Sequence, residues 1–250
     1  MEVNEEVKDI IYGYAKDYCE FTGIDKLPEF EIKVASNEVG EKTYKILVST
    51  MYIPNQDCHK LFISDDIISD IDSLINYKRN FYHEFTHMID AERYAKRSND
   101  NYTYLFGYTE YHASQVELMY MVGAESINSK PSFSMDQLVL PQTSCRKFLD
   151  DKYSLLIAEM SRDSFFKDIY VIKDMLGLLY NYLGLRSICK MYADYKSCED
   201  YSFMVDIFGQ SLWLRIFNDM SGWFDDAKVQ YSYISYSNAA YTLNRKYEES

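Results

Sequence analysis

Glycine is scarce in this chain, with nine copies in 250 residues and none close to another. Nucleotide-binding loops and serine-nucleophile turns need closely spaced glycines, because only glycine lets the backbone turn that tightly or approach a phosphate. The sequence has no GxxxxGK loop, no GxGxxG and no GxSxG. The chain therefore lacks the common nucleotide-binding loops and shows no serine-hydrolase nucleophile.

Basic residues are outnumbered by acidic ones. The chain has 26 Lys and Arg and 39 Asp and Glu, so the formal net charge is −13. Nucleic acids and anionic membranes are bound through clusters of Lys and Arg. We therefore expect no nucleic acid and no membrane among the partners, and interpret the charge as a source of solubility.

Cysteine spacing and apolar runs indicate neither cross-linking nor export. The five cysteines form no CxxC pair, and an odd number in a chain of this length does not indicate a disulfide framework. The stretch MEVNEEVKDI lacks the basic and apolar regions of a signal peptide. The most apolar run, 169–185, is broken by Lys173 and Asp174. We expect a cytoplasmic protein in a reducing compartment.

The front half combines helices with short strands. Apolar residues at helical spacing predict a helix over 3–20, and later helices near 66–77 and 79–97. Alternating patterns predict strands over 29–36, 44–53 and 60–64. The polar stretch 98–101 is interpreted as a break, and 102–108 as a strand or irregular connection. Thr109 is the predicted N-cap of a helix over 110–123.

The back half is predicted to be helical after a linker. Residues 126–144 hold two prolines and several serines, which is typical of a long loop. The helices expected after it are 146–160, 163–182, 184–196, 201–219 and 223–246, with Gly177 and Gly184 as interruptions. The predicted fold class is therefore α+β. A front domain over 1–125 carries the sheet, and 145–250 forms a helical region, as a second domain or as part of the same one.

Histidine is also rare, with four copies, yet two of them stand in HEFTH at 83–87. Residues i and i+4 lie on the same face of a helix, so His83 and His87 present two imidazoles to one point. This arrangement is typical of zinc ligands, with Glu84 placed as a general base rather than as a ligand. The competing interpretation is a pair of structural histidines without a metal.

The rest of this helix is amphipathic in the same register. Phe81, Phe85 and Met88 fall on the side opposite the histidines, so the helix can bury one stripe and still direct both imidazoles into a cleft. Asp90 falls on the histidine face. Its carboxylate is predicted to accept the second ring N–H of a ligating histidine and so fix the orientation of that ring.

A catalytic zinc ion needs a third protein ligand. The HxxGxxH continuation used by one group of zinc enzymes is excluded, because Asp90 and Arg93 stand where glycine and histidine are required. The next stretch with suitable side chains is GYTEYHASQVE at 107–117. Its candidate ligands are Glu110, His112 and Glu117.

HEFTH, followed 23 positions later by Glu110 in EYHA, resembles the gluzincin branch of the zinc metallopeptidases. Within that branch it is most similar to small cytoplasmic bacterial and phage proteins related to repressor-cleaving peptidases. The resemblance covers residues 30–123 and leaves the helical half unmatched. It implies a zincin-like sheet with active-site helices, one Zn²⁺ per chain and Glu110 as the third ligand. It also implies a substrate-binding edge strand just before those helices, here Leu61, Phe62 and Ile63.

The activity implied is hydrolysis of a peptide or protein substrate. A zinc-bound water would give its proton to Glu84, which would pass it to the leaving amine. A further donor would stabilise the oxyanion, and His112 and Tyr108 are candidates for it. The chain departs from some larger gluzincins, which have Asn where Thr109 stands and Asp where Ser114 stands.

Three other interpretations use the same histidines. A peptide deformylase takes a cysteine as third ligand, but Cys58 stands in NQDCHKLF, which lacks the expected surrounding sequence. A zincin-fold binding or regulatory protein, with little or no catalysis, would use the helical half to hold a partner. The third interpretation is a toxin or effector that acts on a host protein.

Overall fold

The computed structural model describes residues 3–35, 47–68, 71–162, 169–196 and 200–249. The described chain is mostly helical with a three-stranded mixed sheet and a two-stranded sheet, which confirms the α+β class. Two compact units are present: Met1–Thr103 with Ala124–Ser129, and Tyr104–Gly123 with Lys130–Ser250. This division differs from the predicted boundary after residue 125, because residues 104–123 group with the helical part.

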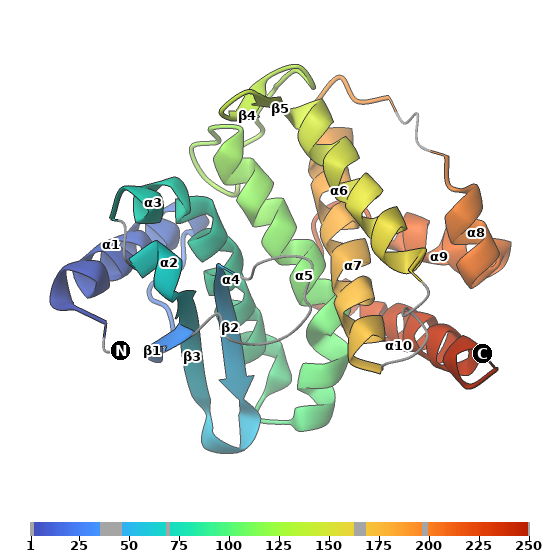
Figure 1. The fold of residues 1–250 in the computed structure, drawn as a ribbon, viewed down its shortest axis with the longest axis horizontal. Helices are drawn as coiled ribbons and strands as arrows, with labels where there is room; N and C mark the ends of the chain where they lie inside the picture. The colour runs from blue at the N-terminus through green and yellow to red at the C-terminus, as the bar shows by residue number, and fades with distance from the viewer. Residues whose placement is uncertain (1–2, 36–46, 69–70, 163–168, 197–199, 250) are drawn as a thin grey trace. The chain divides into compact units, whose positions relative to one another are not determined.

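The first unit contains a small sheet, with one helix before its strands in the sequence and several helices after them (Figure 1). Its elements are α1 (Glu5–Thr22), β1 (Phe30–Ala35), β2 (Val48–Ile53), η1 (Pro54–Gln56), β3 (Cys58–Ser64), α2 (Asp65–Ile68), α3 (Ile71–Asn76), α4 (Lys78–Asp90) and the π-helix η2 (Ala91–Ala95). Each predicted strand is present. Residues 44–46 of the second predicted strand, and 69–70 of the helix predicted over 66–77, lie outside the described residues.

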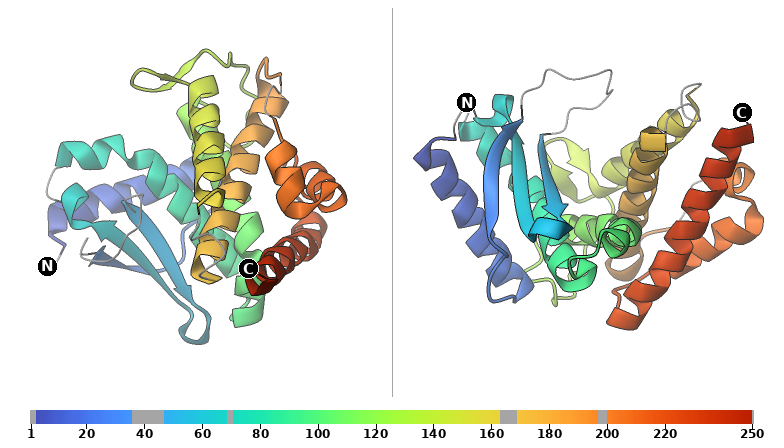
Figure 2. Two further views of the ribbon diagram at one scale, coloured as in Figure 1. Left: turned by 45° about the vertical axis from the view of Figure 1, so that its right-hand side comes forward. Right: turned by 90° about the horizontal axis from the view of Figure 1, so that it is seen from below.

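The sheet has the order β1-β3-β2, so β3 is its middle strand (Figure 2). It pairs with β1 in parallel, Ile32 opposite Leu61, and with β2 in antiparallel, Thr50 opposite Leu61. The prediction that Leu61, Phe62 and Ile63 form a substrate-binding edge is therefore wrong. Their backbone groups already serve two neighbouring strands. The side chains of Leu61 and Ile63 are also fully buried in the core.

Helices α1 and α4 cover one face of this sheet. The Phe30 ring on β1 contacts both helices, with centroid distances of 5.7 Å to Tyr12 of α1 and 5.9 Å to Phe85 of α4. The two helices also contact each other, because the Tyr18 ring meets Phe85 at 5.6 Å. Aromatic packing thus joins α1, α4 and β1 into one core.

The chain breaks after α4 at a different place from the one predicted. Helix α4 continues into η2, and Lys96 and Arg97 then adopt left-handed backbone conformations with φ of 49° and 61°. Helix α5 (Asn99–Met121) begins at once, and the Ser98 hydroxyl accepts the Asn101 N–H at 3.3 Å. The predictions of a break over 98–101, a strand or irregular connection over 102–108 and an N-cap at Thr109 are therefore wrong. Ser98 acts as the helix-starting residue.

The second unit is an assembly of helices that includes α5 from Tyr104 onward. Its later elements are β4 (Leu138–Leu140), β5 (Thr143–Ser144), α6 (Cys145–Met160), α7 (Ile169–Tyr192), α8 (Ser202–Phe208), α9 (Gln210–Asp219) and α10 (Asp226–Glu249). Helix α6 lies beside α7, and α10 lies beside α8 and α9 (Figures 1 and 2). Within the described residues, no helix combines the length and apolar character needed to cross a membrane.

Glycines inside the helices of this unit mark close contacts rather than interruptions. Gly177 and Gly184 both lie within α7, so the prediction of two helices over 163–182 and 184–196 is wrong; residues 163–168 lie outside the described residues. A methyl group on Gly184 would lie 2.1 Å from the Tyr111 carbonyl oxygen and 2.2 Å from Ser114 Oγ on α5. Only a residue without a side chain allows α7 to approach α5 so closely there.

His59, on β3, is a buried histidine outside the HEFTH motif. It is 2% exposed and its ring stacks on Tyr52, with centroids 4.5 Å apart. Its Nε2 atom lies 3.6 Å from Glu92 Oε2, beyond hydrogen-bonding distance. Burial lowers the pKa of His59, and the nearby Glu92 carboxylate partly opposes that shift. The fold therefore favours the neutral form of this ring.

We predict that Gly184→Ala lowers the free energy of unfolding by about 2–4 kcal/mol, because the added methyl overlaps the α5 backbone. Gly13→Ala is the matched control, since Gly13 lies in α1 with nothing within 4 Å of the added methyl. That change should raise the free energy of unfolding by about 0.5–1 kcal/mol through helix propensity. Urea unfolding followed by circular dichroism measures both, and equal effects would contradict the close contact.

We predict that His59 makes the protein less stable in mild acid. Its folded-state pKa lies below the unfolded value of 6.5, so the unfolded chain binds the proton first as the pH falls. The stabilisation is complete above about pH 6.5 and is lost as the pH falls from there to the folded-state pKa. His59→Phe keeps a ring against Tyr52 and should reduce this loss. Urea unfolding at pH 8 and pH 5.5, with a chelator present, measures it. Equal losses in both proteins would contradict the prediction.

Candidate metal centre

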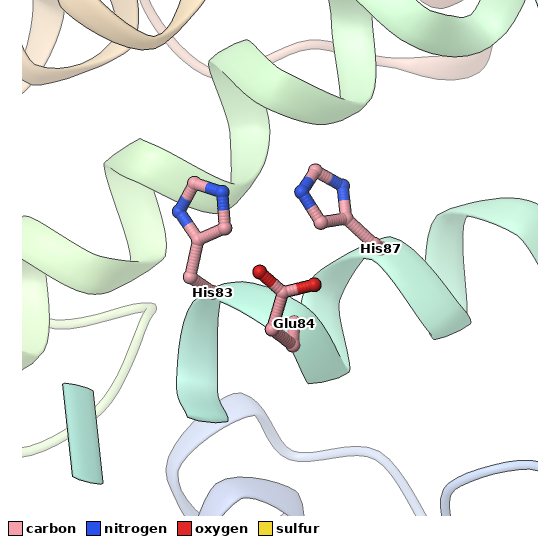
Figure 3. Close-up of side chains that lie close together, drawn as sticks. All are labelled: His83, Glu84 and His87. Atoms are coloured by element: carbon pink, nitrogen blue, oxygen red, sulfur yellow. The ribbon is translucent and has the colours of Figure 1, made fainter. Parts of the chain in front are cut away.

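Helix α4 brings His83, Glu84 and His87 together. One candidate ligand atom from each residue, a ring nitrogen or a carboxylate oxygen, lies within 4.8 Å of the other two. The ring centroids of the two histidines are 4.7 Å apart and the rings are nearly perpendicular, at 79°. Figure 3 shows both imidazoles projecting from the same face of the helix, with the Glu84 carboxylate beside them. The structure thus confirms the juxtaposition predicted from the i, i+4 spacing.

The opposite face of α4 fixes the direction of these side chains. Phe81, Phe85 and Met88 are fully buried, as the amphipathic pattern predicts. Burial of each such side chain stabilises the fold by roughly 1.5–3 kcal/mol. Rotating α4 to hide the histidines would expose this stripe, so packing outweighs any single polar contact at the site.

A hydrogen-bonded chain adds a second restraint from α1. The Tyr18 hydroxyl lies 3.0 Å from Thr86 Oγ1, and the Thr86 hydroxyl donates to the Tyr82 carbonyl at 2.8 Å. Burial raises the pKa of Tyr18 above its usual range; the hydrogen bond with Thr86 opposes this shift and the Asp90 charge reinforces it. Tyr18 therefore stays neutral and holds the residue that directly precedes His87.

The surroundings of the three residues suit a cation. All three residues are partly buried, which reduces screening by water, and the Nδ1 atom of His83 is itself buried. His83 and Glu84 lie in the middle of α4, and His87 lies in its last turn. The π-helix η2 follows directly, and such segments are frequent at functional sites.

The donor set fits a transition-metal ion. Two imidazole nitrogens and a carboxylate oxygen are the ligand types that zinc and related divalent ions take in proteins. Glu84 adds an acidic side chain beside the two imidazoles, which favours a divalent cation. Two of the three predicted roles at this site, ligation by His83 and His87, therefore have the side-chain arrangement that they require.

Asp90 is almost fully buried, at 1% exposed, and its charge contributes to the raised pKa of Tyr18 on α1. Asp90 therefore lies within electrostatic range of Tyr18. Its predicted hydrogen bond to a ligating histidine stays a prediction.

The other predicted site residues lie on the part of α5 that belongs to the second unit. Glu110 is partly buried, and its carboxyl carbon lies 3.8 Å from where a methyl group on Gly177 would stand. Burial raises the pKa of Tyr236 on α10 to about 12, and the Glu110 charge contributes to that rise. Glu117 is buried, at 4% exposed. Within this unit, Glu110 thus has α7 and α10 as neighbours.

The structure brings together the two candidate oxyanion donors. The His112 and Tyr108 rings stack, with centroids 5.3 Å apart and planes at 21°. The connection between α9 and α10 covers them: Phe224 stacks on Tyr108 at 5.6 Å, and Trp223 meets His112 edge-on at 6.0 Å. Sequence reasoning gave no role to Trp223 and Phe224, and no periodic pattern connects them to α5.

Comparison with known proteins gives no relative for this chain. No family model, no curated protein and no solved structure matches it. The arrangement of His83, Glu84 and His87 therefore has to be interpreted from its own chemistry.

We predict that the protein binds about one equivalent of zinc and that His83→Ala or His87→Ala weakens binding at least 100-fold, because each removes one imidazole ligand. His59→Phe is the matched control, since it removes a histidine that is buried against Tyr52. Competition with a colorimetric zinc chelator measures the affinity. Unchanged affinity in both alanine variants would exclude a metal site on α4.

Proposed function

We propose that this protein is a zinc-dependent metallopeptidase of the gluzincin type, a hydrolase that cleaves peptide bonds of a peptide or protein substrate in the cytoplasm. The observation that carries the proposal is the convergence of His83, Glu84 and His87 on one face of α4. The similarity of HEFTH and the later EYHA to that branch adds the substrate class and the compartment.

The proposed roles within HEFTH follow from the chemistry of each group. His83 and His87 hold the ion through ring nitrogens, as neutral imidazoles. Zinc, when bound, supplies Lewis acidity, which makes water more acidic and polarises a carbonyl group. Glu84 accepts a proton from the attacking water and later delivers it to the leaving amine, so that a poor leaving group departs as a neutral amine.

Glu110 is the proposed third ligand, on the strength of the gluzincin resemblance. Two features of the second unit are compatible with that role. The carboxylate is only partly buried, and Gly177 leaves space beside it that a larger side chain would fill. His112 and Glu117 are the alternatives, and Glu117 is the more deeply buried of the two.

His112 is the better of the two candidates for stabilising the oxyanion. Tyr108 is 4% exposed and lies between the His112 and Phe224 rings. The His112 side chain is more exposed and therefore more accessible to a substrate. Stacking on Tyr108 restrains the imidazole, which favours a donor that is already oriented when the substrate arrives.

We predict that Glu84→Gln lowers the rate of peptide hydrolysis at least 1,000-fold while zinc stays bound, because glutamine is isosteric but cannot accept the proton. The substrate probe is a mixture of fluorescence-quenched peptides, and the zinc content is measured on the same samples. Glu92→Gln, on η2 and outside the histidine cluster, is the control and should keep full activity.

The outcomes separate the proposed roles. Loss of zinc in Glu84→Gln would make Glu84 a ligand instead of the base. Zinc binding without hydrolysis by the wild-type protein would favour a binding or regulatory protein over a peptidase. Glu110→Ala should lose both zinc and activity; if it keeps zinc and Glu117→Ala or His112→Ala loses it, the third ligand has to be reassigned.

A further inference from the structure

Two cysteines far apart in the sequence meet in the second unit. Cys145 is the first residue of α6, and Cys189 lies in the last turn of α7, 44 positions later. Their sulfur atoms are 3.6 Å apart and form a thiol hydrogen bond. Both side chains are buried, at 1% and 0% exposed, and both are free thiols.

The backbone around the pair keeps the two ends together. The Cys145 and Arg146 N–H groups donate to the Gln137 and Met135 carbonyls, each at 2.8 Å. The Met135 N–H in turn donates at 2.8 Å to the Asp194 carboxylate, which follows the end of α7. The start of α6 is thereby fixed against the end of α7. The sulfur atoms need to approach by only about 1.5 Å to reach a disulfide bond length of about 2.05 Å.

The site also favours one reactive sulfur. The hydrogen bond from Cys189 lowers the pKa of the Cys145 thiol; burial opposes that shift, and the neighbouring Arg146 charge assists it. The N-terminus of α6 adds a partial positive charge. Each cysteine lies within two residues of an exposed lysine in the sequence, Lys147 or Lys190.

We propose that Cys145 and Cys189 form a redox site at which hydrogen peroxide converts the dithiol into a disulfide. The Cys145 thiolate attacks one peroxide oxygen, and the O–O bond breaks to give a sulfenic acid and hydroxide, which takes up the released proton as water. The Cys189 sulfur then attacks the sulfenic sulfur, forming the S–S bond and releasing a second water. Two thiols lose two electrons in total, and the peroxide gains them. This step is independent of the proposed peptidase activity.

The disulfide would join the open end of the α6–α7 pair. Along the chain, α6 ends at Met160 and α7 begins at Ile169, so Cys145 and Cys189 lie near the opposite ends of these two helices. A link between residues 145 and 189 restricts the unfolded chain across the whole pair, which stabilises the folded unit. A reversible change in the stability of the second unit is the physical result of oxidation.

The test is peroxide treatment of the folded protein, with the metal removed by a chelator. We expect a mass loss of 2 Da, a 145–189 linked peptide in a non-reducing digest, and full reversal by dithiothreitol. The midpoint of thermal unfolding should rise by about 5–10 °C in the oxidised form. Cys19→Ser, which removes a thiol in the first unit, is the matched control and should behave as the wild type does.

The single variants identify the attacking sulfur. Cys189→Ser should accumulate a Cys145 sulfenic acid that dimedone traps, and Cys145→Ser should react far more slowly. The inference is overturned if peroxide that oxidises Cys19 leaves both Cys145 and Cys189 as thiols in the folded protein. It is also overturned if the link forms only after unfolding in urea, or if the linked protein unfolds at the same temperature as the reduced one.

Discussion

The buried back of α4 is the constraint on which the candidate metal centre depends. Phe81, Phe85 and Met88 occupy the core of the first unit, and Phe85 contacts both Phe30 of the sheet and Tyr18 of α1. Because this stripe is buried, only the opposite face of α4 can point away from the core. The two imidazoles occupy that face because of their register with the apolar stripe, and no direct restraint on the rings is needed to explain their direction.

Close contact between helices plays the corresponding role in the second unit. Gly184 permits α7 to contact the α5 backbone, and Gly107 on α5 lies where a methyl group would come within 2.8 Å of the Tyr236 ring. Both contacts involve the helix that carries Glu110. The same packing that stabilises this unit therefore also sets the surroundings of the proposed third ligand, and Gly177 leaves room beside its carboxylate.

Local patterns predicted much of this molecule, and long-range contacts decided the rest. The spacing of HEFTH gave both the shared face of His83 and His87 and the buried stripe behind it, because helical periodicity is a property of neighbouring residues. The three strands were also predicted, but not that β3 lies in the middle, since strand order depends on which distant segments pair. Serine, asparagine and aspartate at 98–101 looked like a loop, although Ser98 starts a helix there. Gly177 and Gly184 in α7 looked like breaks because the residues that they contact on α5 are distant in the sequence. The contact between Cys145 and Cys189 left no sequence signal for the same reason.

The course of the chain between the two units has a consequence for how the protein is made. Residues 104–123 belong to the second unit, but Ala124–Ser129 return to the first, where the Ile127 N–H donates to the Phe21 carbonyl at 3.0 Å. No single cleavage point separates the units. During translation, the hydrogen bond between Ile127 and Phe21 can form only after residue 127 has been synthesised, and the whole of α5 precedes that residue in the chain. The histidine helix and the helix with Glu110 are therefore both synthesised before the last segment of the first unit, Ala124–Ser129.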